Sequence, residues 1–396
     1  MDKLRIYRYE EGYADIKGIG ITEKGKLIIT KQADLHPTFN SYTRVIRNPI
    51  VSRALSAPIK LFIDPSTKCP LKCPFCLSNS SSISFQELTK EEINRFTDEI
   101  IQIGVLKVKI GGGEPFIYPY FFDLIEKLGN AGIYVSTSTS AITLPHISAE
   151  KLEILRQNNV KVSISLDGDE KYHDHIRASN GLYKKVTESI PILLNNGIKV
   201  ELRTTIVNTE ESYKQISTLN DISKRFNIPI RIRSVKPKGR ALSSDLTLVY
   251  PDKKYWAFFD ELRKLSAQNP LINTEEVFCY DGTAHYSVFK QGLDCAAGTR
   301  SAYIDWNGNF SPCGFIASYF PPENLSNTNI LTLWQTGKSF LSVRDFFRKE
   351  NEKSNCSKCQ YVNACQGGCP SVRLSARAPI DPRCPINRKI FEKERM

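Results

Sequence analysis

Between residues 59 and 233 the chain alternates short apolar runs with longer amphipathic segments. The short runs predict β-strands, and the amphipathic segments predict α-helices. The predicted strands are Ile59–Ile63, Lys107–Ile110, Ile133–Ser136, Lys161–Leu166, Lys199–Ile206 and Ile230–Arg233. The predicted helices between them are Lys90–Gln102, Tyr120–Ala131, Ser148–Asn158, Tyr183–Asn196 and Glu211–Phe226.

Strands and helices that follow one another in turn imply parallel strands joined by right-handed crossovers. A closed barrel of this kind needs eight such units, and six leave it open. We therefore expect an α/β fold in which residues 56–250 form a curved, partial (β/α)6 barrel of the TIM-like type.

The segments on either side of this region have a different pattern. Residues 1–55 predict an N-terminal extension with a β-hairpin around Lys24-Gly25. Beyond a boundary near residue 250 we expect a bridging helix, Lys253–Gln268, and then a loop-rich segment to residue 396 with a short strand at Ser301–Asp305. Because that segment has little regular apolar pattern, bound metal is a plausible source of its stability.

Composition narrows the class of protein. No apolar run among the 396 residues is long enough to span a membrane, and the charged N-terminus lacks the apolar centre of a secretory signal. We expect a cytoplasmic protein. The net charge of +12 comes from scattered Lys and Arg residues, so we expect neither a nucleic acid nor a membrane as partner.

The chain has 11 cysteines, and they fall into two groups. Cytosolic proteins rarely keep disulfides, so clustered cysteines there indicate metal binding. The first group is Cys69, Cys73 and Cys76. The second is Cys279, Cys295, Cys313, Cys356, Cys359, Cys365, Cys369 and Cys384.

The first group has the spacing C-x3-C-x2-C and directly follows the first predicted barrel strand. This position is the rim where barrels of this type carry their chemistry. Three thiolates on one loop can bind three irons of a [4Fe–4S] cube and leave the fourth iron for a cofactor. The alternatives are a zinc loop with a distant fourth ligand, or reduced structural thiols.

This motif resembles that of the radical S-adenosyl-L-methionine (SAM) superfamily. The resemblance implies that SAM chelates the open iron and that Phe75 lies near its adenine. Gly112, Gly113 and Glu114, after the second strand, resemble the motif that holds the SAM amino group. Ser165 and Asp167, at the end of the fourth strand, would lie near the SAM carboxylate and ribose.

Three further segments bear on this resemblance. Arg177 is a candidate partner of the SAM carboxylate, with a surface ion pair to Asp169 or Asp174 as the alternative. Thr139-Ser140-Ala141 stands where many relatives carry Thr-Asn-Gly. Lys236–Arg240 resembles the family's Pro-x-Gly-Arg turn.

The second cysteine group resembles the SPASM extension of radical SAM proteins, which implies two auxiliary [4Fe–4S] clusters and three clusters in all. By position, Cys295, Cys313 and Cys369 would bind the first auxiliary cluster. Cys356, Cys359, Cys365 and Cys384 would bind the second. Two closed cubes need eight ligands, so Cys279 either completes the first or is a structural thiol that leaves one iron open. Zinc is the alternative metal.

The resemblance implies an oxidoreductase that cleaves SAM reductively and abstracts a hydrogen atom from a peptide or protein. Our leading hypothesis is maturation of a ribosomally synthesised peptide by thioether or carbon–carbon cross-linking. We expect a reductant such as flavodoxin or ferredoxin as a partner, and a separate peptide-carrier protein as a further one. Candidate general bases are Tyr280, Asp281, His285, Tyr286 and Asp305.

Three alternatives stay open. An anaerobic sulfatase-maturating enzyme usually carries Asp after the second SPASM cysteine, whereas Gly314 follows Cys313 here. A small-molecule radical SAM dehydrogenase is the second alternative. The third is a cluster-bearing electron-transfer protein without SAM chemistry.

Overall fold

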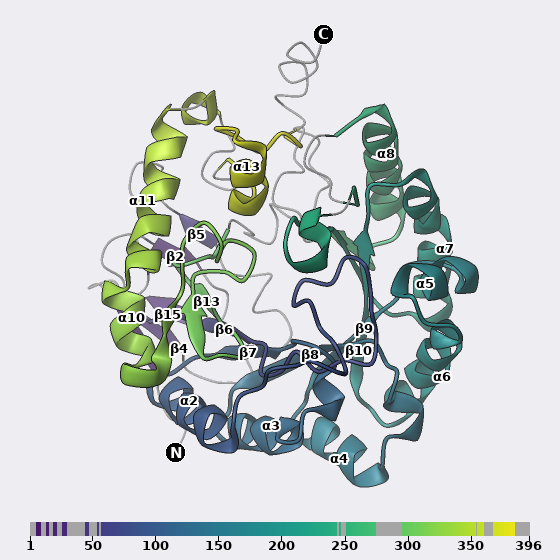
Figure 1. Ribbon diagram of the computed structural model, residues 1–396, viewed down its shortest axis with the longest axis horizontal. Helices are drawn as coiled ribbons and strands as arrows, with labels where there is room; N and C mark the ends of the chain where they lie inside the picture. Colours follow the sequence, from purple (N-terminus) through teal and green to yellow (C-terminus); the bar gives the residue numbers. More distant parts are fainter. Residues whose placement is uncertain are drawn as a thin grey trace.

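The computed structural model describes residues 57–243, 251–274, 295–353, 355–359 and 367–384, positions 54 and 245–246, and five short strands between residues 5 and 46. Its centre is a ten-stranded sheet with the strand order β12-β11-β10-β9-β8-β7-β6-β13-β14-β15. Figure 1 shows this sheet curving through the middle of the molecule, with helices on its outer side.

All six predicted barrel strands are present and pair in parallel with their neighbours in chain order. They are β6 (Lys60–Ile63), β7 (Lys107–Ile110), β8 (Tyr134–Thr139), β9 (Lys161–Ser165), β10 (Lys199–Ile206) and β11 (Ile230–Ser234). β8 runs three residues beyond its predicted end because Thr137 and Thr139 still pair with β9. The prediction of an α/β fold with a curved parallel sheet is confirmed.

The sheet extends beyond these six strands at both edges. β12 (Ile272–Thr274) pairs in parallel with β11, and β13 (Ser301–Ile304) pairs in parallel with β6. β14 (Asn309–Ser311) and β15 (Glu323–Asn324) continue the sheet antiparallel beyond β13. Residues on both sides of the predicted boundary at 250 therefore share one sheet. The division into three domains stays a prediction.

Period-two alternation gives the barrel strands one apolar face and one polar face. Leu61, Ile63, Val108 and Ile110 are fully buried in the main core. That core lies between the sheet and the outer helices α2 (Lys90–Gln102), α3 (Phe121–Asn130), α4 (Ala149–Gln157), α6 (Leu182–Asn195), α7 (Glu210–Phe226) and α8 (Lys253–Gln268). The five helices predicted in the barrel and the bridging helix are thus confirmed.

Helix α5 (Glu170–Arg177) was not predicted. Its eight residues include a single aliphatic side chain, Ile176, so the apolar signal is weak. Asp169 starts the helix by accepting a hydrogen bond from the Tyr172 amide at 2.8 Å. Ala178, in the left-handed conformation with φ 51°, ends it.

The segment after residue 300 contains more helix than its sequence pattern indicated. α10 (Ile330–Thr336), α11 (Lys338–Lys353) and α13 (Pro370–Ala376) lie there. The Glu99 carboxylate accepts a hydrogen bond from the Ile330 amide at 2.8 Å, which ties α10 to α2. Figure 1 shows α10 and α11 on the side of the molecule where β13–β15 lie.

The predicted N-terminal hairpin is confirmed as β3 (Ile19–Ile21) and β4 (Lys26–Ile29), which pair antiparallel. β1 (Arg5–Arg8) extends it on the other side of β4, and β2 (Tyr13–Asp15) pairs with β5 (Arg44–Ile46). None of the helices in the described ranges is both long and apolar enough to cross a bilayer.

Candidate functional site

The cysteine loop leaves the carboxyl end of β6 and folds back on itself. The Cys69 amide donates to the Ser81 carbonyl at 3.1 Å, and the Cys76 amide donates to the Cys73 carbonyl at 3.2 Å. Cys69 and Cys73 are 8% and 7% exposed, so water reaches their sulfurs poorly. The loop therefore presents two buried thiols and the partly exposed thiol of Cys76 at the rim of the barrel.

The electrostatics of these thiols suit a bound cation. Burial raises the pKa of Cys69 to about 12, and the nearby charges of Glu114, Cys73 and Cys76 add to the shift. Burial likewise raises the pKa of Cys73. Thiols held this close in a protein without metal stay protonated, whereas a bound metal deprotonates them outright.

Three cysteines on one loop are the donor set that a [4Fe–4S] cube with one open iron needs. In the described part of the chain, no three Cys, His, Asp or Glu side chains are grouped so as to hold one metal ion. A cube does not need such a group, because its thiolates bind separate irons.

A glycine-lined loop lies against the residues that lead into Cys69. Gly112 has φ 106°, and a Cβ atom there would stand 2.4 Å from the Ser66 carbonyl oxygen. A Cβ atom at Gly113 would stand 2.0 Å from the Lys68 carbonyl oxygen. The Gly113 and Glu114 amides donate to the same two carbonyls at 2.7 and 2.8 Å. Only glycine allows this close approach of two backbones.

The Glu114 side chain is buried at 1% exposure and is hydrogen-bonded to β8. Its carboxylate accepts from the Thr139 and Ser140 hydroxyls, each at 2.6 Å, and from the Ser140 amide at 2.9 Å. Burial raises its pKa, and these hydrogen bonds oppose the rise. Thr139-Ser140 thus has a defined polar role.

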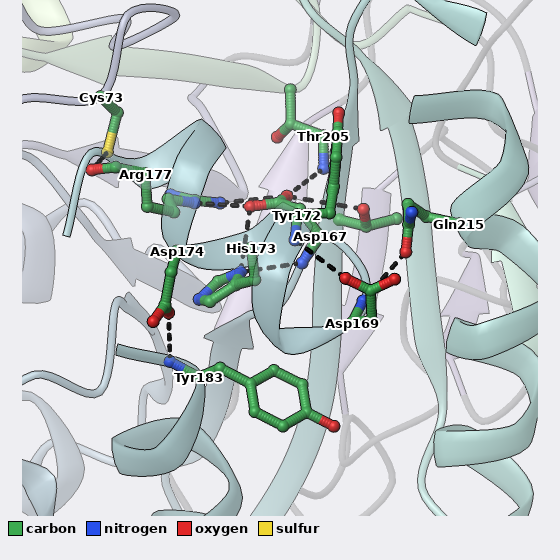
Figure 2. Close-up of polar contacts among 11 residues, drawn as sticks. Cys73, Asp167, Asp169, Tyr172, His173, Asp174, Arg177, Tyr183, Thr205 and Gln215 are labelled. Atoms are coloured by element: carbon green, nitrogen blue, oxygen red, sulfur yellow. Dashed lines mark hydrogen bonds and ion pairs between the residues drawn. The ribbon is translucent and has the colours of Figure 1, made fainter. Parts of the chain in front are cut away.

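Arg177 and Asp167 form a buried ion pair (Figure 2). Arg177 Nε lies 2.6 Å from Asp167 Oδ2, and Nη2 lies 3.2 Å from Oδ1. Burial alone would raise the pKa of Asp167, but Arg177 and His173 outweigh it and hold that pKa well below its usual range. The surface ion pair that we considered for Arg177 is wrong, because Asp169 and Asp174 accept from the Tyr172 and Tyr183 amides instead.

The same arginine contacts the cysteine loop. Its guanidinium lies 5.0 Å from the centre of the Phe75 ring, and its carbonyl accepts from Cys73 Sγ at 3.7 Å. Ser165 ends β9 at the same rim, two positions before Asp167. The structure therefore brings Cys73, Phe75, Asp167 and Arg177 together.

The turn after β11 clamps the cysteine loop from the other side. The Arg240 amide donates to the Cys76 carbonyl at 3.0 Å, and Arg240 Nε donates to the Cys73 carbonyl at 2.7 Å. A Cβ atom at Gly239 would stand 2.2 Å from the Cys76 carbonyl oxygen. The Lys236–Arg240 turn, which the sequence indicated by resemblance alone, thus fixes two of the three cysteines.

The C-terminal cysteines lie in two neighbourhoods. Cys295 and Cys313 pack on one small apolar cluster, and burial raises the pKa of Cys313 to about 11, with the charge of Cys369 adding to the rise. Cys356 and Cys359 pack together beside Ile380. This division matches the two predicted ligand sets. Cys384 is described at the end of its loop, whereas Cys279 and Cys365 lie outside the described residues.

Of the five candidate bases, the structure describes Asp305 alone; Tyr280, Asp281, His285 and Tyr286 lie outside the described ranges. Asp305 shapes a turn, because its carboxylate accepts from the Asn307 and Asn309 amides at 2.9 and 3.0 Å. Asp64, which directly follows β6, is buried and was not among the predicted site residues. An acidic residue at the end of the apolar run LFID was a signal for it.

Two family models match parts of the chain, and several known proteins are similar to it. The family model described as "Radical SAM superfamily" matches residues 63–219, and the one described as "Iron-sulfur cluster-binding domain" (SPASM) matches residues 295–360. The chain is 26% identical over 340 residues to a mycofactocin maturase, MftC, of Mycolicibacterium smegmatis, covering 84% of each chain. It is 24% identical over 330 residues to an AdoMet-dependent heme synthase of Methanosarcina barkeri, covering 79% of this chain and 91% of the relative.

Among solved structures, the fold is similar to that of Streptococcus suis SuiB bound to its precursor peptide SuiA. The TM-score is 0.65 at 21% sequence identity, covering 84% of this chain and 77% of the other. At that identity the likeness concerns the fold. The shared feature is an α/β fold with a parallel sheet.

Proposed function

The chain is an enzyme of the radical SAM superfamily that also carries a SPASM domain, and from this premise we propose that it uses SAM radical chemistry to modify a peptide. The single observation that carries the proposal is the contact between the loop of Cys69, Cys73 and Cys76 and the glycine-lined loop after β7. It puts two buried thiols, those of Cys69 and Cys73, and the partly exposed thiol of Cys76 beside a backbone cradle that a Cβ atom would fill.

Cys69, Cys73 and Cys76 would hold a [4Fe–4S] cluster, with SAM bound next to it against Gly112 and Gly113. When bound, this pair supplies a 5′-deoxyadenosyl radical that abstracts a hydrogen atom from carbon. The protein's own part is to position and to exclude water. The low exposure of Cys69 and Cys73 and the buried Glu114 carboxylate serve that purpose.

Arg177 and Asp167 would act as a supporting pair for this site. Their two hydrogen bonds fix the last turn of α5, and the Arg177 carbonyl in turn contacts the Cys73 thiol. Phe75, stacked on the guanidinium, would line the adenine side. Ser165 at the end of β9 completes the polar rim that we assign to the SAM carboxylate and ribose.

The C-terminal cysteines would hold two auxiliary [4Fe–4S] clusters, for three in all. Cys295, Cys313 and Cys369 would ligate the first, with Cys279 as the proposed fourth ligand. Cys356, Cys359, Cys365 and Cys384 would ligate the second. The separation of the described members into two neighbourhoods supports this assignment.

The substrate we propose is a ribosomally synthesised peptide that acquires a thioether or carbon–carbon cross-link. The named maturase relative and the SuiB structure with its precursor peptide support a peptide. A reductant such as flavodoxin or ferredoxin would deliver electrons, and a separate carrier protein would present the peptide. The 24% identity to an AdoMet-dependent heme synthase favours a small-molecule substrate as the second candidate.

Anaerobic reconstitution tests the proposal. The full chain should bind about 12 irons, four for each cube. With dithionite and SAM it should form 5′-deoxyadenosine. On co-expression with short peptides encoded beside its gene, one peptide should lose two hydrogens per cross-link in mass spectrometry. A loaded protein that never cleaves SAM contradicts the enzyme proposal, and SAM cleavage without change in any peptide contradicts the peptide substrate.

A further inference from the structure

Asp64 and Tyr303 form a buried hydrogen bond between two distant parts of the chain. The Tyr303 hydroxyl donates to Asp64 Oδ2 at 2.8 Å across 239 positions of sequence. Asp64 is 9% exposed and Tyr303 is 6% exposed. Both lie on the face of the sheet opposite the apolar core, because the alternate residues Ile63 and Ile304 belong to that core.

The pair joins the strand that precedes the first cysteine loop to a strand that precedes Cys313. Asp64 stands five positions before Cys69, and Tyr303 stands ten positions before Cys313. β6 and β13, which carry them, are direct neighbours in the sheet, with Tyr303 in register with Phe62. A Cβ atom at Gly112 would stand 3.4 Å from Asp64 Cα, and one at Gly314, the residue after Cys313, would stand 3.2 Å from the Tyr303 ring. The pair therefore lies next to the glycine-lined loop and next to the segment that carries Cys313.

The surroundings keep the carboxylate of Asp64 in place and poorly hydrated. A Cβ atom at Gly111 would stand 2.7 Å from Asp64 Oδ1, so the absence of a side chain on β7 makes room for it. The charged and titratable groups that act on it are Tyr303, Lys238, Asp305 and Arg233, from β13, the turn after β11, the turn after β13, and β11. Burial raises the pKa of Asp64 to about 6, against the lowering effect of Tyr303, Lys238 and Arg233.

A purely structural role does not require a carboxylate. Four backbone pairs already join β6 to β13, and an asparagine could accept the same hydrogen bond from Tyr303. Burying an acid that ionises is costlier than burying an amide. A carboxylic acid whose pKa lies near neutral is instead what a general base needs.

We propose that Asp64 is the proton acceptor of the peptide modification and that Tyr303 is its positioning residue. This inference rests on the proposed function. Loss of a hydrogen atom leaves a carbon radical on the peptide. When a nucleophilic group such as a cysteine thiol joins that carbon, the C–S bond forms and the S–H bond breaks. The proton passes to the Asp64 carboxylate, and the remaining electron passes to an iron–sulfur cluster held by the C-terminal cysteines.

The first test compares Asp64→Asn with the unchanged protein. The substrate is the peptide that is cross-linked in co-expression, and it carries deuterium at the position from which the hydrogen atom is abstracted. We expect deuterium still to reach 5′-deoxyadenosine, while cross-linked product falls at least about 100-fold. The ratio of 5′-deoxyadenosine to product therefore rises. Product formation that is unchanged, or that falls only in proportion to SAM cleavage, overturns the assignment.

Tyr303→Phe gives a second, milder test that also serves if Asp64→Asn does not fold. The Tyr303 hydrogen bond lowers the pKa of Asp64, so its removal raises that pKa further. In the unchanged protein, the rate of product formation should rise as the pH increases through about 6. In Tyr303→Phe this rise should occur at higher pH. Tyr118→Phe is the matched control, because the hydroxyl it removes donates to the Leu88 carbonyl instead. If the rise occurs at the same pH in Tyr303→Phe as in the unchanged protein, or shifts equally in Tyr118→Phe, the proposed roles of Asp64 and Tyr303 are contradicted.

A spectroscopic readout separates this proposal from the proposed function. Infrared difference spectra of the full reconstituted chain should show a protonated-carboxyl band that titrates near pH 6. The band should be missing in Asp64→Asn and shifted in Tyr303→Phe. Absence of any band that depends on Asp64 overturns the inference even in a protein that modifies its peptide. Absence of SAM cleavage with the band present contradicts the proposed function alone.

Discussion

Asp167 and Arg177 are both buried and are joined by two hydrogen bonds, 2.6 and 3.2 Å long, beside the cysteine loop. Asp167 also accepts from the Thr205 amide at 3.0 Å, which ties the pair to β10. Arg177 ends α5, and its carbonyl meets the Cys73 thiol. The pair thus connects the barrel wall to one of the three proposed iron ligands (Figure 2).

Removing one partner of this pair should destabilise the fold strongly. Arg177→Ala leaves the Asp167 carboxylate buried without its counter-charge, a change that typically costs about 3–5 kcal/mol. Chemical denaturation at pH 7 measures the loss. The control is Arg156→Ala, since Arg156 pairs with Glu153 on an exposed face of α4 and its loss should change little. Equal stability of the two variants would contradict a structural role for the pair.

The same pair predicts a pH dependence. The pKa of Asp167 is depressed in the folded chain relative to its usual 3.8, so its contribution to stability is fully present above about pH 4. It is lost progressively as the pH falls below that value. Glu201 and Asp381, whose pKa values are also lowered, add to the slope. The free energy of unfolding, measured by denaturation between pH 3 and 7, should therefore change less with pH for Asp167→Asn than for the unchanged protein. The same dependence of the unfolding free energy on pH in both proteins would contradict this contribution of Asp167 to stability.

Features that depend on the pattern within one segment were predictable from the sequence, whereas contacts between distant positions were not. Strands β6–β11 and the helices between them were predictable because their periodicity lies within each segment. The pairing of Tyr303 with Asp64 joins positions 239 residues apart, and nothing local to Ser301–Ile304 indicates that β13 belongs beside β6. Similarly, the sequence places acidic residues at positions 167, 169 and 174 near Arg177, and only the structure shows that Arg177 pairs with the buried Asp167.

Gly112 should not tolerate a side chain. Its φ of 106° and the 2.4 Å separation from the Ser66 oxygen together predict that Gly112→Ala shifts the cysteine loop. Loss of a few kcal/mol of stability and of SAM binding is expected. Gly181→Ala separates the two causes, because Gly181 has φ 74° but no atom within 4 Å of its Cβ position. That control should cost about 1 kcal/mol through backbone strain alone and leave SAM binding intact. Intact SAM binding in Gly112→Ala would contradict the cradle.

Ser140 should matter through Glu114. Ser140→Ala removes a 2.6 Å hydrogen bond to a buried carboxylate and leaves the Ser140 amide bond in place. A loss of about 1–3 kcal/mol in unfolding free energy is expected, and the pKa of Glu114 should rise further. Thermal denaturation measures the effect, with Ser217→Ala as control because that hydroxyl bonds an exposed helix carbonyl. If both variants unfold alike, the link between Glu114 and β8 contributes nothing measurable.

Substitution of single cysteines should divide the chemistry between the two ends of the chain. Cys73→Ala removes one of three proposed ligands of the SAM-binding cluster, so about four irons should be lost and 5′-deoxyadenosine formation should fall to background. Cys369→Ala, in the other group, should lose irons while SAM is still cleaved, because its cysteine lies near Cys313 rather than near Cys73. Iron analysis and chromatography of 5′-deoxyadenosine on the two anaerobic proteins measure both effects. Continued SAM cleavage in Cys73→Ala would contradict the assignment of the first cysteine loop. Loss of SAM cleavage in Cys369→Ala while the SAM-binding cluster is fully loaded would contradict the independence of that cluster from the C-terminal cysteines.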